Sequence, residues 1–264
     1  MNTEKHPSKQ IYTTLDQMIY LPSTMHTTNA LIQTLQNAFA GLAFELTSEG
    51  NFVLLTKELN EDDSMDLVLD LEFYYRNPHL PLENLCSRLN NYHPQNLTQQ
   101  ELLRHAKALV DLEGSHIAAG LFIYGLPGVG KTHVAVGTAK EFMRKGINGN
   151  YMNLHPHFIG NYRYILNEVE TKHFIIDQTW IMDDLNSPFS TAMKIFKVIV
   201  LNIHNYGGRM FVTSNISYDF LMENGFVTDP GEKERFIDRV KGMFTLLQVD
   251  GGSQRAKTAW YNQM

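Results

Sequence analysis

The chain of 264 residues contains a single cysteine, Cys86. One cysteine cannot form a disulfide within the chain, and it cannot supply a cysteine zinc cluster. The simplest interpretation of Cys86 is a small buried apolar side chain. The eleven histidines show no spacing typical of a metal site. His155 and His157, which flank Pro156, fit a loop better.

Long apolar runs are also missing. No stretch approaches the roughly 18 uncharged apolar residues that a membrane span needs. The first six residues lack the basic and then apolar segments of a signal peptide. We therefore expect a cytoplasmic protein with no membrane partner.

Positive charge is scarce in the first part of the chain. The net charge is −6. Residues 1–111 carry 7 basic and 14 acidic side chains, a net of −7, whereas residues 112–264 carry 15 and 14, a net of +1. The strongly basic surface of many nucleic-acid-binding proteins is absent. Any DNA contact must therefore come from local basic side chains gathered by oligomerisation, and the acidic first part favours a protein partner.

The most informative stretch is Gly-Leu-Pro-Gly-Val-Gly-Lys-Thr at residues 125–132. It matches G-x-x-x-x-G-K-[ST], the phosphate-binding P-loop. The glycines let the backbone turn tightly and direct N–H groups at phosphates. Lys131 adds a charge for the β- and γ-phosphates, and the Thr132 hydroxyl is a ligand for Mg²⁺. An apolar run at 121–124 and a helical pattern at 134–144 give the expected strand–loop–helix context.

A nucleoside triphosphatase also needs a carboxylate for the metal, usually at the tip of a neighbouring strand. The apolar run at 179–184 ends in two carboxylates, Asp183 and Asp184. Asp183 is the candidate metal ligand, and Asp184 could polarise the attacking water. A rival run at 174–177 ends in the single carboxylate of Asp177, so we favour the pair.

Three further side chains are candidates for a role in hydrolysis. Asn215 ends the apolar run at 210–215, where its amide could orient the water or contact the γ-phosphate, or could serve only as a turn residue. Arg235 and Arg239 lie one helical turn apart. Either could be an arginine finger for a neighbouring subunit's nucleotide, or an ordinary surface arginine. Arg255 is a weaker candidate.

The chain pattern predicts a small α+β module followed by an alternation of strands and helices. In the first part we expect a loosely held arm with a short helix at 1–25, a helix at 29–40, a hairpin of 42–46 and 52–55 around a turn at 48–51, and a helix at 65–75. Thr98 to Glu101 resembles a capping box that opens a helix to about 112. Beyond the P-loop we expect strands at 150–154, 179–184, 210–215 and 244–249, with helices at 158–169, at 192–205 and ending at 235–240.

These motifs together resemble one family. The P-loop followed by His133, the segments 181–185 and 213–215, and Asp238-Arg239-Val240 are similar to the DnaC/IstB branch of the AAA+ ATPases. That branch includes bacterial helicase loaders and transposase-helper ATPases. The segment 91–111 is similar to the lead-in that these proteins place before the P-loop. The resemblance covers about residues 88–255.

The resemblance implies a fold and a set of site residues. The fold is an α/β AAA+ P-loop domain at 88–264, with a five-stranded parallel sheet and no C-terminal helical lid; a small α+β N-terminal module at 1–87 precedes it. The cofactors are ATP and Mg²⁺, with Thr132 and Asp183 as metal ligands. Asp184, Asn215 and Arg239 are the implied catalytic residues. The implied nucleotide-binding residues are Gly125, Leu126, Pro127, Gly128, Val129, Gly130, Lys131, Thr132 and His133.

The leading function is a helicase loader that binds a replicative helicase through its N-terminal module and assembles as an ATP-dependent homo-oligomer on single-stranded DNA. One alternative is an IstB-like helper that binds target duplex DNA for a transposase. Another is a nucleotide-gated adaptor that does not bind DNA.

Overall fold

The computed structural model describes residues 12–14, 18–20, 29–40, 42–46, 52–55, 59–112, 118–155, 178–187, 191–225 and 230–252. The chain divides into two compact units, an N-terminal unit of residues 1–86 and a C-terminal unit of residues 87–264. Among the described residues, no helix combines the length and the apolar character needed to cross a membrane. The predicted turn at 48–51, the helix at 158–169, the rival Asp177, and His157 and Arg255 lie outside the described residues.

The N-terminal unit contains an antiparallel sheet in the order β1-β2-β4-β3. Its strands are β1 (Tyr12–Thr14), β2 (Met18–Tyr20), β3 (Ala43–Leu46) and β4 (Phe52–Leu55). Leu46 pairs with Phe52, so β3 and β4 form the predicted hairpin. The short helix expected in the first 25 residues was wrong. That segment forms β1 and β2, whose β-branched and aromatic residues suit strands, and β2 pairs with β4.

In its described residues this unit also contains the helices α1 (Asn29–Ala38) and α2 (Glu61–Arg76) and the short 3₁₀ helix η1 (Leu82–Asn84). The Asn60 side chain caps α2 by accepting the Asp63 N–H at 2.8 Å. Three acidic residues in the first turn of α2 interact favourably with the helix dipole. Cys86 is partly buried against the apolar core of the unit. That core consists of Leu31, Leu35, Phe39, Leu42, Leu59, Leu67, Leu71 and Leu85.

The C-terminal unit is built on a five-stranded sheet in the order β6-β7-β8-β5-β9. The strands are β5 (Ala118–Gly125), β6 (Asn148–Asn153), β7 (Gln178–Asp183), β8 (Gly208–Ser214) and β9 (Phe244–Val249). Every neighbouring pair is parallel, which confirms the predicted five-stranded parallel sheet. Since both faces of such a sheet are covered, its strands read as continuous apolar runs.

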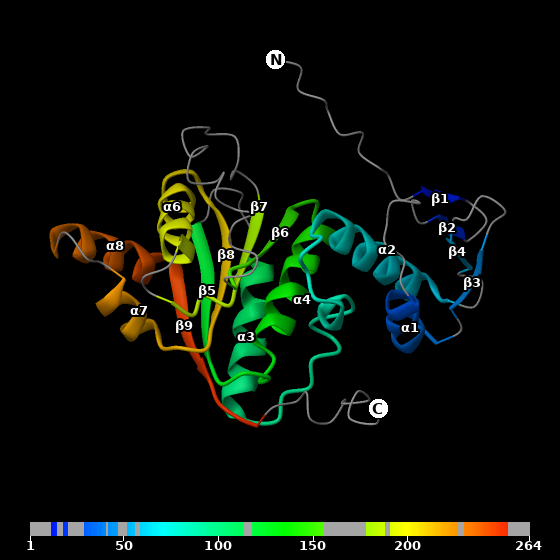
Figure 1. Ribbon diagram of the computed structural model, residues 1–264, viewed down its shortest axis with the longest axis horizontal. Helices are drawn as coiled ribbons and strands as arrows, with labels where there is room; N and C mark the ends of the chain where they lie inside the picture. Colours follow the sequence, from blue (N-terminus) through cyan, green and yellow to red (C-terminus); the bar gives the residue numbers. More distant parts are fainter. Residues whose placement is uncertain are drawn as a thin grey trace, which may run out of the picture. The chain divides into compact units, whose positions relative to one another are not determined.

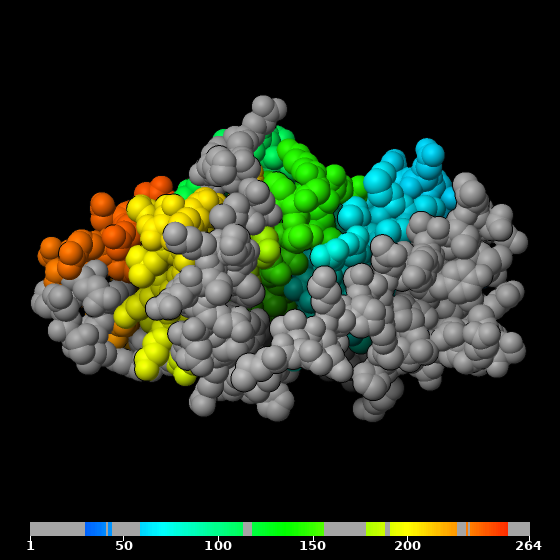
Figure 2. Space-filling model, turned by 90° about the horizontal axis from the view of Figure 1, so that it is seen from above, coloured from blue at the N-terminus to red at the C-terminus, as the bar shows by residue number. Residues whose placement is uncertain are grey.

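Helices cover both faces of this sheet (Figure 1). The helices α3 (Leu97–Asp111) and α4 (Lys131–Arg144) pack on one face, and α6 (Thr191–Tyr206) and α8 (Pro230–Met243) pack on the other. In Figure 2, α6 (yellow) and α8 (orange) lie side by side. Under them, Phe122 of β5 meets Phe196 of α6 edge to face, with ring centroids 6.2 Å apart. The short helix α7 (Tyr218–Asn224) follows β8.

The start of α3 corrects the expected cap. Asn96, and not Thr98, is the N-cap, and its side chain accepts the Gln99 N–H at 3.0 Å. Asn caps a helix as well as Thr does. The Thr98 hydroxyl instead accepts the Asp250 N–H at 3.0 Å, which fastens α3 to the residue after β9. Within the described residues, β9 is the last element.

Candidate nucleotide-binding site

The P-loop connects β5 to α4, and two of its glycines are required by their neighbours. Gly125 has φ 146°, and a Cβ there would lie 2.1 Å from the carbonyl oxygen of Val249 in β9. Gly130 has φ 95°, and a Cβ there would lie 2.4 Å from the Tyr92 ring. A side chain at either position would therefore strain the backbone and displace the loop.

Lys131 is the first residue of α4, and its buried ammonium group lies at the mouth of the P-loop. Nζ donates to the carbonyl oxygens of Gly125 at 2.8 Å and Leu126 at 2.9 Å, and to Asn215 Oδ1 at 2.9 Å. An ammonium group has three donors, and here all three point at oxygen acceptors. Phosphate oxygens are stronger acceptors than these neutral groups, so the position suits an anion that enters the loop.

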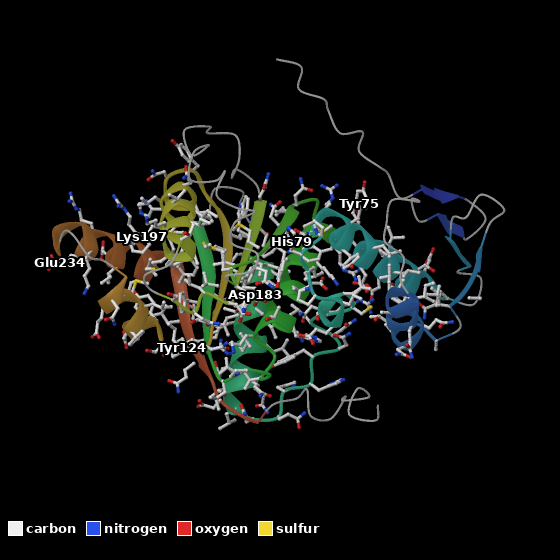
Figure 3. The ribbon with its side chains drawn as sticks, in the orientation of Figure 1. Tyr75, His79, Tyr124, Asp183, Lys197 and Glu234 are labelled. Atoms are coloured by element: carbon white, nitrogen blue, oxygen red, sulfur yellow. The ribbon has the colours of Figure 1, made fainter. Side chains whose placement is uncertain are left out.

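Asp183, which is labelled in Figure 3, ends β7. Three hydroxyl groups donate to its carboxylate. Thr132 Oγ1 donates to Asp183 Oδ1 at 2.7 Å, and Thr213 Oγ1 donates to the same oxygen at 2.5 Å. Tyr151 Oη donates to Oδ2 at 2.7 Å. A threonine hydroxyl and a carboxylate in contact beside a phosphate loop are the oxygen ligands that Mg²⁺ prefers. The fold therefore brings the two predicted metal ligands together.

The surroundings of Asp183 disfavour the charged form of its carboxyl group. Burial raises the pKa of its carboxyl group, and the nearby charge of Asp184 raises it further. The hydroxyl groups of Thr213, Tyr151 and Thr132 act against this by stabilising the carboxylate. A divalent cation at this place would favour the charged form much more strongly than three hydroxyl groups do. The electrostatics therefore fit a cation site.

Asp184 has a backbone conformation that is rare for a residue with a side chain, with φ 61°. Its N–H donates to Thr213 Oγ1 at 3.1 Å, and the next N–H, of Leu185, donates to the Thr213 carbonyl at 2.9 Å. Such a conformation costs about 1–3 kcal/mol and persists only where neighbours hold it. Asp184 is only partly buried, whereas the neighbouring Asp183 is buried.

Asn215 follows β8 and meets both the P-loop and the end of β7. Its side chain accepts from Lys131, as above, and its N–H donates to Asn186 Oδ1 at 2.6 Å. The Asn186 Nδ2 in turn lies 3.4 Å from Asp184 Oδ1. The candidate residues Lys131, Asp184 and Asn215 are thus gathered at the carboxyl edge of the sheet.

The His133 side chain bonds within the protein. Its Nε2 lies 3.0 Å from the Arg88 carbonyl oxygen and 2.8 Å from Asn91 Oδ1. Its ring packs against Tyr92, with centroids 5.4 Å apart, and the Tyr92 hydroxyl donates to the Val129 carbonyl at 3.1 Å. Burial lowers the pKa of His133 and raises that of Tyr92 to about 12. His133 therefore fastens the segment before α3 to the P-loop helix.

Comparison with solved structures shows the same architecture in three proteins. The crystal structure of DnaI has a TM-score of 0.53 at 19% identity and is matched over 67% of this chain and 95% of its own. The DnaC helicase loader has a TM-score of 0.52 at 23% identity, over 64% of this chain and 99% of its own. A protein described as a primosome component from Streptococcus pyogenes serotype M3 has a TM-score of 0.54 at 19% identity. The match covers 69% of this chain and 97% of that protein.

This chain has the AAA+ fold of the DnaC-type helicase loaders. The predicted fold is thereby confirmed, and so is the predicted resemblance of that fold to DnaC. No protein-family model matches the chain, and no curated protein matches it either.

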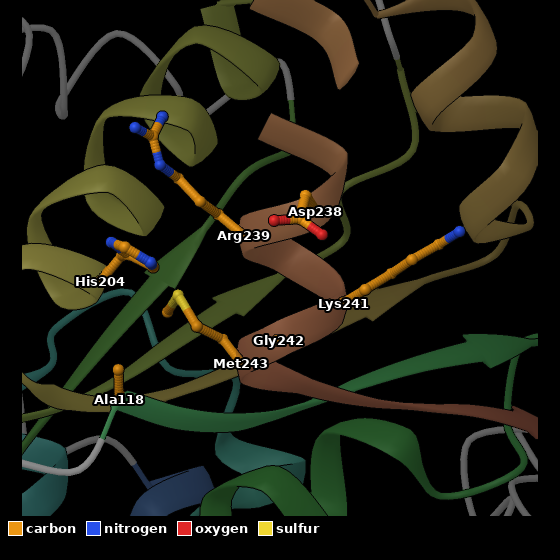
Figure 4. Close-up of a pocket in the computed structure, with 7 residues that line it drawn as sticks. All are labelled: Ala118, His204, Asp238, Arg239, Lys241, Gly242 and Met243. Atoms are coloured by element: carbon orange, nitrogen blue, oxygen red, sulfur yellow. The ribbon is translucent and has the colours of Figure 1, made fainter. Parts of the chain in front are cut away.

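Arg239 lies apart from the other candidate residues of the C-terminal unit. It lines a pocket of about 540 Å³ with Ala118, His204, Asp238, Lys241, Gly242 and Met243 (Figure 4). In Figure 4, Arg239 points along α6, whereas Lys241 points the other way. Ala118 begins β5 and the P-loop follows its end, so about 23 Å of strand separates them at 3.3 Å per residue. Arg235 is exposed and donates to the Gly231 carbonyl of its own helix at 3.0 Å.

Four side chains of the site were not predicted as functional residues: Tyr92, Tyr151, Asn186 and Thr213. Thr213 stands in the motif that ends in Asn215, and Tyr151 stands in a predicted strand. The positions of Tyr151 and Thr213 in predicted strands were visible in the sequence. The order of the strands, which brings their side chains to Asp183, was not.

Proposed function

We propose that this protein is a Mg²⁺-dependent ATPase of the helicase-loader type. The observation that carries the proposal is the contact between Thr132 and Asp183 beside Lys131 in a glycine-rich loop. Lys131 and Thr132 begin α4, and Asp183 ends β7. Each has the chemistry that a bound nucleoside triphosphate and its metal require.

When bound, ATP and Mg²⁺ supply a phosphoanhydride to be cleaved and a Lewis acid beside it. Lys131 would exchange its carbonyl partners for phosphate oxygens. Thr132 and Asp183 would hold the metal ion. Asp184, which is partly buried, would accept a proton from the attacking water. Asn215 would contact the water or the phosphate that is transferred.

Arg239 enters this mechanism from a second copy of the chain. Within one chain it lines a pocket with Ala118, the first residue of β5, whereas the P-loop follows the last residue of that strand, about 23 Å further along it. An arginine finger supplied in trans would make turnover depend on assembly. We therefore propose an ATP-dependent homo-oligomer in which Arg239 approaches a neighbour's nucleotide.

The acidic N-terminal part supports a protein partner, and we propose a replicative helicase for it. The C-terminal part, with a net charge near zero, supplies the basic side chains of α6 and α8 for single-stranded DNA. A nucleotide-gated adaptor that does not bind DNA is the second candidate, since no strong excess of positive charge is present.

The test is ATP hydrolysis by the full chain with and without single-stranded DNA, and with duplex DNA of the same sequence as control. Stimulation by the single strand, and binding that weakens as salt rises, support the loader. Stimulation by the duplex alone supports the transposase helper. Hydrolysis that neither DNA changes, with no DNA bound at low salt, supports the adaptor. Capture of purified replicative helicase by the full chain then tests the partner.

A further inference from the structure

Asn186 stands between two residues of the site and contacts both. Its Oδ1 accepts the Asn215 N–H at 2.6 Å, a short hydrogen bond, and its Nδ2 lies 3.4 Å from Asp184 Oδ1. An N–H group can only donate, so it fixes which end of the Asn186 amide carries the oxygen. The NH₂ end must then face the Asp184 carboxylate, which can only accept.

The place of Asn186 explains why such a link matters. The backbone ladder between β7 and β8 ends at the pair Met182 and Val212. Asp184 and Asn215 both lie beyond it, where one backbone hydrogen bond, from the Leu185 N–H to the Thr213 carbonyl, and several side-chain contacts hold the two strand tips together. Ser214 Oγ donates to the Leu185 carbonyl at 2.8 Å, and Asn186 adds the outermost link.

A chain of contacts results, which passes through both the side chain and the backbone N–H of Asn215. Lys131 Nζ donates to Asn215 Oδ1, the Asn215 N–H donates to Asn186, and Asn186 faces Asp184. The chain joins the P-loop lysine to the candidate catalytic acid without passing through Asp183 or Thr132. Groups linked in this way restrict each other's positions.

We propose that Asn186 is a positioning residue that holds Asp184 and Asn215 in the arrangement required for hydrolysis. The inference rests on the proposed ATPase function and deepens it. Asn186 itself is exposed, so its side chain adds little to the core. Its removal acts on turnover through Asp184 and leaves folding and nucleotide affinity nearly unchanged.

The first test is Asn186→Ala in the full chain. Loss of the amide should lower kcat about tenfold, which corresponds to 1.4 kcal/mol, with KM for ATP and the affinity for a fluorescent ATP analogue changed less than about threefold. Asn205→Ala, an exposed asparagine near the end of α6, is the matched control and should behave as the parent. An equal loss of affinity and turnover, or parental turnover in Asn186→Ala, would overturn the proposal.

A double-mutant cycle separates positioning from a general structural effect. In an Asp184→Asn background the group that Asn186 orients is already missing, so Asn186→Ala should lower the residual turnover by less than about twofold. A full additional tenfold loss would show that Asn186 does not act through Asp184.

Hydrogen exchange gives a readout that needs no nucleotide. In Asn186→Ala the Asn215 amide proton should lose protection, whereas Asn186→Asp keeps an oxygen for it and should retain protection. Asn186→Asp nevertheless places a carboxylate against Asp184, so its turnover should fall at least as far as that of Asn186→Ala. Unchanged protection in Asn186→Ala would contradict the geometry. If the parent protein failed to bind or hydrolyse ATP while protection changed as expected, the ATPase assignment would fail and the contact would stand.

Discussion

At the scale of single residues, the site depends on how Asp183 is surrounded. A fully buried carboxylate is unfavourable without partners, and three hydroxyl groups supply only neutral donors. The same three contacts fix both oxygens in place before a metal ion arrives. Asp183 is thus held in position at an electrostatic cost that a divalent cation would remove.

We predict that Asp183→Asn weakens nucleotide binding specifically when Mg²⁺ is present. The substitution keeps the shape of the side chain and removes the charge that the metal ion needs. Calorimetric titration with ATP should show at least about a tenfold loss of affinity in Mg²⁺, on the scale of one charged hydrogen bond. With EDTA the variant and the parent should bind alike. The same loss under both conditions would mean that Asp183 serves the fold and not the metal.

Asp184 should separate binding from chemistry. Asp184→Asn leaves Lys131, Thr132 and Asp183 unchanged and removes the group that we propose takes the proton from water. We expect near-parental affinity for ATP and a fall in kcat of about 10²-fold, the scale of general-base loss. Parallel binding and single-turnover measurements test this. A loss of binding as large as the loss of turnover would identify Asp184, and not Asp183, as the metal ligand.

At the scale of secondary-structure elements, the segment before α3 is packed directly on α4. A Cβ at Gly137 of α4 would lie 2.8 Å from the backbone of Arg88 and Leu89. His133 on the same helix bonds the Arg88 carbonyl, and Tyr92 reaches the P-loop. Because backbone atoms cannot turn aside as a flexible side chain can, this contact allows little expansion.

Gly137→Ala should therefore destabilise the C-terminal unit by about 1–3 kcal/mol, as overpacking commonly does. The matched control is Gly242→Ala in α8, where a Cβ would meet nothing within 4 Å. That change should stabilise by up to about 1 kcal/mol because alanine favours a helix. Chemical denaturation followed by the fluorescence of Trp180, which is buried in β7, measures both. Equal effects of the two substitutions would contradict the packing described for α4.

The secondary-structure elements also show how much of the fold and of the site the sequence predicts. The P-loop, the paired acids and the parallel strands were predictable because each depends on a local pattern: glycine spacing, an apolar run, a polar tip. The strands β1 and β2 were missed because three residues carry little periodicity and because β4, the strand that joins β2 to the rest of the sheet, lies more than 30 residues away. The contacts of Thr213, Tyr151 and Asn186 depend on strand order, which no local pattern encodes.

At the scale of the whole molecule, two features affect self-association: the net negative charge of the chain and Arg239, which we propose approaches a neighbour's nucleotide. We predict that Arg239→Ala binds ATP normally and hydrolyses it poorly, with Arg235→Ala as control. Mixed with Asp184→Asn, which keeps its finger and lacks its own acid, the Arg239→Ala protein should regain partial activity at shared interfaces. Turnover should rise with protein concentration, and self-association of the acidic chain should strengthen as salt screens repulsion. Full activity of Arg239→Ala as a strict monomer would contradict assembly through Arg239.

The central claim is that the loop at 125–132 binds the phosphates of ATP through Lys131. The most direct measurement is a titration of the full chain and of Lys131→Ala with a fluorescent ATP analogue in Mg²⁺. We expect saturable binding by the parent and a loss of about tenfold or more in the variant, because the substitution removes the ammonium group that contacts the carbonyl oxygens of the loop. Equal affinity of the two proteins would contradict it.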